Sequence, residues 1–322
     1  MISGAAIPSV GPANGIRPVD TRRDMAGLAD LLAIAFASTL DSAGRRMVSS
    51  MRRLGRAGLP GWLLGHVILP PAAYPQGFVW ETDGKLVGNA SMMEVAGYPR
   101  RYVIANVAVH PGSRRKGIAS TLVQACLDDA REKRGREVVL QVDAGNAGAR
   151  RLYEKLGFTT TSTRVIWTRD GLPLDWKLDP APMRLRRPEE WKAQWSLAQK
   201  LYPEGAVWPY PLRPSLFKSS SFLDRIGVGT RRHWVWMEAG KLRASLTARW
   251  GIDDGRWRLL LMLAPDLQNQ AEPAVLQYGL QALQQGTAPI ALDHPEDAGR
   301  EHFLRMKFRP RRTLTWMRRY VR

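Results

Sequence analysis

The stretch that decides the fold opens with VAVHPGSRRKGIAS at 107–120 and closes with NAGARRLYEKLGF at 146–158. At its start, Tyr102–Val109 is almost unbroken in apolar and β-favouring residues, which predicts a buried strand. Pro111 ends that strand. After Ile118 the apolar residues recur at helical spacing, so the polar segment between strand and helix is expected to lead into a helix N-terminus.

Three cations, Arg114, Arg115 and Lys116, precede that helix, and Gly117 follows them. A helix start presents free backbone N–H groups and the positive end of the helix dipole, and both attract phosphate. The cations add full positive charge, and a glycine lets phosphate oxygens approach the backbone closely. Alone, such a loop is a weak signal, because many helices begin in this way.

The closing part of the stretch predicts a second strand and helix. A β-rich run at 136–142 is followed by Asn146, a residue type that often caps a helix start. Tyr153 comes seven residues later and therefore lies two turns along the same helix face. Gly157 is expected to end the helix, and Phe158 to begin another strand.

Together these segments resemble the GNAT family, the GCN5-related N-acetyltransferases. The family's phosphate loop reads Arg/Gln-x-x-Gly-x-Gly/Ala, and residues 114–119 fit it, with Arg115 where many members have glycine. The later helix of many members reads Asn-x-x-Ala-x-x-Leu-Tyr-x-x-x-Gly-Phe, and residues 146–158 fit every fixed position. The resemblance covers roughly residues 15–168 and implies an α/β fold with a mixed sheet and acetyl-CoA as cosubstrate.

The resemblance also implies which residues hold acetyl-CoA. Strand backbone groups would pair with the pantetheine arm, the N–H of Val107 would polarise the thioester oxygen, and the loop would take the pyrophosphate. Asn146 keeps two interpretations, a contact with the carrier or its loop and a plain helix cap. The expected binding residues are Val107, Ala108, Val109, Arg114, Arg115, Lys116, Gly117, Ile118, Ala119, Ser120, Asn146 and Tyr153.

Two residues are expected to take part in catalysis. The resemblance implies that Tyr153 is the general acid for the leaving thiolate, while the alternative is an aromatic residue packed on the sheet. Val103 stands where histone-acetylating relatives carry a strand glutamate, so the base is harder to identify. Glu94, on the preceding predicted strand, is the expected base, although a water chain could also deprotonate the amine. Weaker candidates for the base are Asp143, His66 and His110.

The composition is strongly basic, with 48 Lys and Arg against 29 Asp and Glu and a formal net charge of +19. Such a charge favours anionic partners such as CoA, but no nucleic-acid motif accompanies it, so a nucleic-acid role is not expected. One cysteine excludes an internal disulfide framework, and no apolar run is long enough to span a bilayer. No metal-spaced cluster of ligands occurs. These features predict a cytoplasmic protein without a metal and leave its oligomeric state open.

The expected second helix, at about 41–56, is rich in arginine. Met47, Met51 and Leu54 share one of its faces. The arginines occupy much of the remainder, either as a solvated surface or as a basic rim that would favour an acidic acceptor.

The second half resembles a degenerate copy of the first. FVWETDGKL at 78–86 corresponds to WVWMEAGKL at 234–242, and the apolar run at 103–111 corresponds to 257–265. The following segment, 266–272, contains two acids and no Arg, Lys or Gly, so CoA is not expected to bind there. The sequence thus predicts two tandem acyl-CoA N-acyltransferase-like domains. Their expected order is a loose tail at 1–14, an acetyltransferase domain at 15–168, a linker at 169–182 and a degenerate domain at 183–322.

The function implied by the resemblance is N-acetyltransferase activity. A primary amine of a small-molecule or peptide acceptor would attack the acetyl group of acetyl-CoA directly, but the residues do not identify that acceptor. The alternative is a non-catalytic protein that binds or senses acyl-CoA. The retained Asn146 and Tyr153 favour the enzyme, whereas the missing strand carboxylate keeps the alternative open.

Overall fold

The computed structural model describes residues 14–40, 42–58, 76–95, 97–170, 181–202, 206–207, 210–218, 230–251, 255–283 and 288–321. The expected tail at 1–14, except Asn14, and most of the expected linker at 169–182 lie outside these residues. The chain divides into two compact units. Unit 1 comprises 1–94, 100–138 and 320–322, and unit 2 comprises 95–99 and 139–319. The domains 15–168 and 183–322 remain a proposal about the sequence repeat, because the compact units divide the chain elsewhere.

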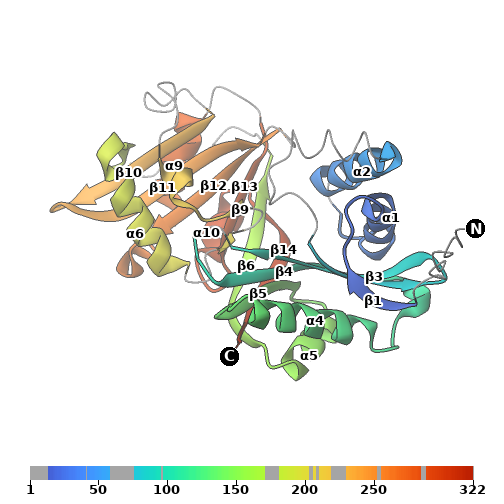
Figure 1. The fold of residues 1–322 in the computed structure, drawn as a ribbon. Coiled ribbons are helices and arrows are strands. Elements are labelled where there is room, and N and C mark those ends of the chain that lie inside the picture. Colours follow the sequence, from blue (N-terminus) through green and yellow to red (C-terminus); the bar gives the residue numbers. More distant parts are fainter. Residues whose placement is uncertain are drawn as a thin grey trace, which may run out of the picture. The chain divides into compact units, whose positions relative to one another are not determined.

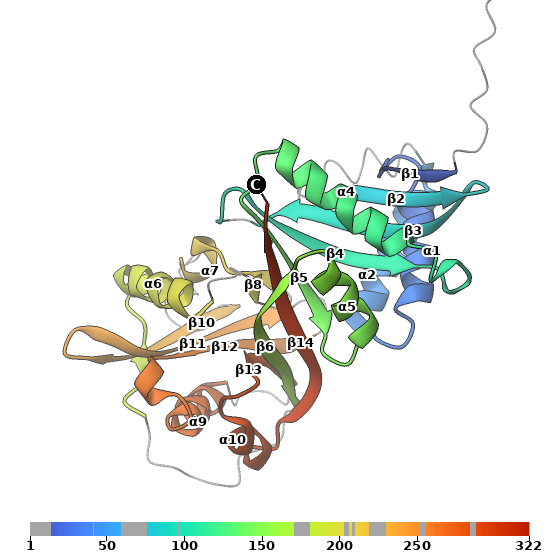
Figure 2. The ribbon, with the colours of Figure 1, turned by 90° about the horizontal axis from the view of Figure 1, so that it is seen from below.

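Unit 1 is a sheet covered by helices on both faces (Figures 1 and 2). Its four first strands pair antiparallel with their neighbours in chain order. Helices α1 and α2 lie over one face, and α4 lies over the other. The elements are β1 (Gly15–Pro18), α1 (Met25–Ala35), α2 (Ser42–Arg56), β2 (Gly77–Thr82), β3 (Lys85–Glu94), β4 (Arg101–Val109), a 3-10 turn (Pro111–Ser113), α4 (Ile118–Glu132) and the start of β5 (Glu137–Asp143).

Alternation along the strands assigns residues to these two faces. Ala108 of β4 is buried with Leu32 of α1 and Val48 of α2. On the opposite face, a Cβ on Gly88 of β3 would lie 2.7 Å from Cγ2 of Ile118. The absence of a side chain at position 88 therefore lets α4 pack directly on the strand backbone.

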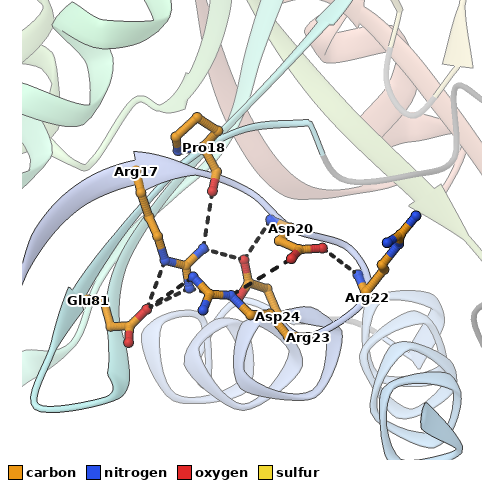
Figure 3. A network of polar contacts seen from close by, with 7 residues as sticks. All are labelled: Arg17, Pro18, Asp20, Arg22, Arg23, Asp24 and Glu81. Atoms are coloured by element: carbon orange, nitrogen blue, oxygen red, sulfur yellow. Dashed lines mark hydrogen bonds and ion pairs between the residues drawn. The ribbon is translucent and has the colours of Figure 1, made fainter. Parts of the chain in front are cut away.

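An arginine on β1 fixes the start of α1 (Figure 3). The two terminal nitrogens of Arg17 donate to the Asp24 carboxylate at 2.7 and 2.8 Å, and its Nε donates to Glu81 at 2.8 Å. The Asp24 carboxylate also accepts the Asp20 N–H at 2.7 Å, and it is 3% exposed. This two-bond contact between a guanidinium and a carboxylate joins strand, loop and helix.

Unit 2 contains the rest of β5 and most strands of the second half. Its strand order is β5-β14-β6-β13-β12-β11-β10-β7. Strands β12 and β13 pair parallel, and β6 runs antiparallel to both β13 and β14. The elements are α5 (Ala147–Lys155), β6 (Thr159–Arg169), β7 (Arg184–Leu185), α6 (Trp191–Leu201), β8 (Ala206–Val207), β9 (Tyr210–Pro211), α7 (Pro214–Phe217), β10 (Arg231–Glu238), β11 (Lys241–Gly251), β12 (Arg256–Leu263), α9 (Glu272–Ala282), β13 (Ile290–Pro295), α10 (Arg300–Arg305) and β14 (Arg309–Tyr320), with short 3-10 turns at Pro188–Glu190 and Pro265–Leu267.

Apolar clusters fill both faces of the unit 2 sheet. Phe303 of α10 and Val275 of α9 pack with Trp167 of β6 in the larger cluster. Phe217 of α7 packs with Met262 of β12 in a second cluster. All five of these side chains are at most 1% exposed, so both faces contribute to the hydrophobic stabilisation of the unit.

The two halves repeat local details as well as element order. The β2–β3 hairpin has a register shift between Trp80 and Glu81, and the β10–β11 hairpin has one between Trp236 and Met237. Arg184 forms two bonds with Glu190, just as Arg17 does with Asp24. The repeat predicted from the sequence is therefore present in the local geometry.

Candidate functional site

The loop between β4 and α4 is an exposed, cationic helix entrance. Nδ1 of His110 accepts the Gly112 N–H at 3.3 Å and so caps the 3-10 turn that starts the loop. Arg114, Arg115 and Lys116 follow, and all three are exposed. The first N–H groups of α4 have no acceptor within the helix. The loop therefore offers backbone donors, a helix dipole and three exposed cations to an anion.

Gly117 is the N-cap of α4 and has a left-handed backbone, with φ 78°. A Cβ at this position would meet no atom within 4 Å. A side chain would therefore extend into the open space next to the first-turn N–H groups. This is the space that a phosphate needs in order to reach the backbone.

Strand β4 contains a bulge that the sequence did not predict. Ala108 pairs with Asn89, and Ala105 pairs with Ser91. Between these two pairs β4 therefore has one residue more than β3. Asn106, inside the bulge, has φ 53°. A bulge leaves part of one strand out of the regular ladder and reorients its peptide groups. The predicted binding residues Val107 to Val109 thus follow an irregularity in the strand.

Tyr153 lies on α5, in unit 2, and is 6% exposed. Its ring meets that of Phe158 edge-on, with centroids 6.0 Å apart. Burial raises the pKa of its phenol to about 12. Its hydroxyl makes no hydrogen bond to another residue that the structure describes.

Asn146 is the N-cap of α5, and its side-chain oxygen accepts the Ala149 N–H at 3.0 Å. Asn146 thus caps the helix through Oδ1, and its contact with the carrier or its loop stays a prediction. Asp143, the second candidate base, accepts the Gly145 N–H at 3.1 Å and lies 3.6 Å from the Arg312 Nε. Both residues stabilise the turn between β5 and α5.

Glu94 has a structural partner of its own. It is exposed at the end of β3, where its carboxylate accepts the Arg100 N–H at 2.9 Å. It pairs with Tyr102, four residues before Asn106. At about 3.3 Å per residue, this places it roughly 13 Å along the strand from the bulge. Its role as a base stays a prediction, and this separation does not favour it. His66 lies outside the described residues.

The predicted residues thus fall into separate groups. The strand residues 107–109 and the loop residues 114–120 are consecutive parts of unit 1. Glu94 is also in unit 1, at the far end of β3. Asn146 and Tyr153 belong to unit 2. The contacts described above for each group are therefore contacts within a single unit.

In the second half, the loop between β12 and α9 corresponds to the cationic loop of unit 1. Its backbone is hydrogen-bonded to a carboxylate of the chain itself, that of Glu272. Oε1 of Glu272, at the start of α9, accepts the Asn269 N–H at 2.7 Å, and Asn269 in turn accepts the Gly299 N–H at 2.8 Å. Glu272 is 0% exposed and lies 3.9 Å from the His294 imidazole. Hydrogen bonding holds the pKa of Glu272 below its usual value despite burial, and burial lowers the pKa of His294. A buried anion therefore already fills this helix N-terminus.

Glu272→Ala is expected to lower the free energy of unfolding by about 1–3 kcal/mol at pH 7, because it removes the hydrogen bond between the Asn269 N–H and a buried, charged carboxylate. The stabilisation is present above the ordinary glutamate pKa of about 4.5 and is lost as the pH falls through the lowered folded value. Denaturant unfolding from pH 7 to 3 measures both effects. The matched control is Glu301→Ala, whose side chain is 85% exposed and which should change stability by less than about 0.5 kcal/mol. Equal stability of the two variants would contradict this assignment.

A cavity of about 660 Å³ in unit 1 is lined by both signs of charge, including Arg17, Asp24, Glu81 and Lys85. Within the described part of the chain, no group of three or more His, Cys, Asp or Glu could hold a metal ion. No helix found there is long and apolar enough to cross a bilayer.

The known sequences that this chain resembles are all acetyltransferases among those described below. Residues 61–158 match the acetyltransferase (GNAT) family. A mycothiol acetyltransferase of Corynebacterium glutamicum is 35% identical over 90 residues, which are 28% of this chain and 30% of that protein. A [ribosomal protein bS18]-alanine N-acetyltransferase of Escherichia coli is 42% identical over 69 residues, 20% of this chain and 46% of that protein. The matched segments span 30% and 46% of the length of these two relatives.

Comparison with solved structures extends over nearly the whole chain. A GCN5-related N-acetyltransferase from Sphaerobacter thermophilus has a TM-score of 0.60 at 15% identity and covers 95% of both chains. A tandem GNAT protein from the clavulanic acid biosynthesis pathway has a TM-score of 0.55 at 17% identity and covers 95% of this chain and 98% of that one. The predicted fold, an α/β chain with a mixed sheet and two tandem GNAT-like units, is therefore confirmed.

Proposed function

Because residues 61–158 match the acetyltransferase (GNAT) family, we propose that this chain transfers the acetyl group of acetyl-CoA to a primary amine. The observation that carries the proposal is the combination, within unit 1, of a bulged β4 with an exposed cationic loop that enters α4. The first offers a reoriented backbone amide, and the second offers an anion site. In the described part of the second half, β11 and β12 pair without a bulge, and the segment 266–272 that leads into α9 carries no Arg or Lys.

The loop fits the pyrophosphate of the cosubstrate. A diphosphate needs several donors that are already in place, and the first turn of α4 provides them without moving. The exposed cations at 114–116 would add charge-assisted bonds. The open space at Gly117 leaves room for the oxygens. Residues 107–109 would pair with the pantetheine arm through their backbone.

The reaction proposed is direct attack. The neutral amine nitrogen forms a bond to the thioester carbonyl carbon, and the carbon–sulfur bond then breaks. The amine loses a proton, and the thiolate of CoA gains one. The Val107 N–H is the proposed donor to the carbonyl oxygen as it gains charge. Tyr153 is the proposed donor to the sulfur, while the base remains a choice between Glu94, Asp143 and water.

The acceptor is proposed only as a class. Among the relatives are enzymes named for mycothiol, for L-methionine sulfoximine or sulfone, and for an alanine of a ribosomal protein. These names include small amines and a protein amine. A primary amine on a small molecule or a peptide is the acceptor class proposed for this chain.

Two measurements test this function. Acetyl-CoA should raise the melting temperature, because it binds only the folded chain. Release of CoA thiol should then accelerate on addition of at least one amine from a panel of amino acids, peptides with a free N-terminal alanine, and amino sugars. Binding without thiol release across the panel would favour the non-catalytic acyl-CoA-binding alternative. An unchanged melting temperature at millimolar acetyl-CoA would contradict both functions.

A further inference from the structure

A buried asparagine side chain bonds directly to the bulge of β4. Nδ2 of Asn89, on β3, donates to the main-chain oxygen of Asn106 at 2.8 Å and to Oγ of Ser91 at 3.2 Å. Asn89 is 1% exposed and Ser91 is 3% exposed. The Asn106 carbonyl can only accept, so the side-chain nitrogen of Asn89 must be the atom that faces it.

This bond determines where the next N–H group points. The carbonyl of Asn106 and the N–H of Val107 belong to one planar trans peptide, so they point in opposite directions. Asn89 holds the carbonyl toward β3. The Val107 N–H is therefore turned toward the other edge of β4. Asn106 has φ 53°, a backbone conformation that a regular strand would not adopt, and the side-chain bond compensates for part of its cost.

The second half provides an internal comparison. Counting from the shared Gly-Lys-Leu turn, Ser245 of β11 occupies the position of Asn89 of β3. Strands β11 and β12 pair without any register shift from Ala244 to Gly251. The Ser245 hydroxyl accepts a bond from the side chain of Gln194 on α6, at 2.5 Å. The strand pair that lacks the asparagine thus also lacks the bulge.

The burial of Asn89 also has an energetic consequence. An amide side chain is costly to bury unless it is hydrogen-bonded, and Oδ1 of Asn89 has no partner among the described residues. A serine or an apolar residue would avoid that cost. The residue is therefore poorly explained as a means of stabilising the fold alone.

We propose that Asn89 is a positioning residue that fixes the β4 bulge and so aims the Val107 N–H at the thioester oxygen. It acts through the Asn106 carbonyl and does not touch the substrate. The inference rests on the proposed acetyl transfer, because it assigns the bulge to that reaction. It predicts an effect on the rate of the chemical step that exceeds the effect on cosubstrate binding.

The decisive variant is Asn89→Ser, which installs the residue found in the second half. We expect kcat to fall by ~10-fold or more, because the loss of one well-placed oxyanion donor costs ~10²–10³ and here the donor is misaimed but still present. The KM for acetyl-CoA should change by less than about threefold, since the phosphate loop is intact. Ser91→Ala is the matched control. It removes the other partner of the same amide and should leave kcat within about threefold of the wild type.

A second readout does not need an acceptor. Acetyl-CoA has a thioester carbonyl that the Val107 N–H could bond, and free CoA lacks this group. Wild-type protein should prefer acetyl-CoA to CoA in a calorimetric titration, and Asn89→Ser should reduce that preference while binding CoA normally. Asn89→Ala, which removes the donor without adding a charge, serves if the serine variant does not fold. Wild-type kcat and wild-type preference in a folded variant would overturn the inference. A wild-type protein that binds acetyl-CoA but turns over no amine would instead contradict the proposed function.

Discussion

Gly117→Val is expected to weaken acetyl-CoA binding by at least ~100-fold. Valine at φ 78° would be strained, and its methyl groups would occupy the open space beside the first turn of α4. The phosphate oxygens could then no longer reach the backbone N–H groups. A hydrogen bond to a charged group contributes about 1.5–3 kcal/mol, so the loss of two such bonds accounts for the expected factor.

The measurement is thermal or denaturant unfolding with and without acetyl-CoA. At a concentration of acetyl-CoA about 1,000 times the wild-type Kd, binding should add about 4 kcal/mol to the free energy of unfolding. A 100-fold weaker site would add only about 1.4 kcal/mol at the same concentration. The difference corresponds to several degrees in melting temperature for a chain of this size.

Gly240→Val is the matched control for the backbone strain. Gly240, in the β10–β11 turn, has φ 74°, and a Cβ there would also meet nothing within 4 Å. Without ligand, the Gly240→Val variant should lose about as much free energy of unfolding as Gly117→Val. Acetyl-CoA should still stabilise it as much as it stabilises the wild type. Wild-type affinity in Gly117→Val would show that the phosphates do not bind at this loop.

The parts of the site that the sequence predicted are those determined by local pattern. The strand ending at Val109, the helix beginning at Ile118 and the helix capped by Asn146 all occur where the spacing placed them. Periodicity and capping depend on residues within a few positions of each other. The phosphate loop connects two such elements, so its position followed from theirs.

The bulge could not be predicted in the same way. It depends on how β3 and β4 are aligned, and register is a property of a strand pair. The signal in the sequence was indirect: Asn89 and Ser91 are polar residues within an otherwise apolar strand. On α2, similarly, Val48 contacts the core at 3% exposure while Met47 is 48% exposed. Methionine spacing alone did not identify the buried face of that helix.

Strand order was another feature that the repeat did not reveal. Strand β6, from the first half of the sequence, lies between β13 and β14, which come from the second half. A sequence repeat indicates that two segments have the same local structure. It does not determine which strands pair, since that choice depends on contacts between residues more than 100 positions apart, such as Thr163 and Thr315.

Tyr153→Phe is expected to lower kcat by ~10²-fold or more if Tyr153 supplies the proton or hydrogen bond to the leaving sulfur. Phenylalanine keeps the edge-on contact with Phe158 and removes only the hydroxyl. Affinity for acetyl-CoA should change little, because the loop and strand backbone provide most of the proposed binding. Stability should change by no more than about 1 kcal/mol, since the hydroxyl bonds to no other described residue.

The pH dependence follows from the burial of the phenol. Burial raises its pKa to about 12, so the hydroxyl stays protonated throughout the usual assay range. A pKa this far above that of a thiol, about 8.5, favours a hydrogen bond to the sulfur over complete proton transfer before the carbon–sulfur bond breaks. The wild-type rate should therefore show no loss from Tyr153 ionisation up to about pH 10.

Tyr202→Phe is the matched control for a buried tyrosine hydroxyl. Tyr202 is 3% exposed, and its hydroxyl donates to the Leu261 carbonyl at 3.2 Å. Its loss should cost about 1 kcal/mol of stability and leave kcat unchanged. The test needs an acceptor from the amine panel and a demonstration that chemistry limits the rate. If Tyr153→Phe then turns over at the wild-type rate, Tyr153 is a packing residue, and the sulfur takes its proton from solvent.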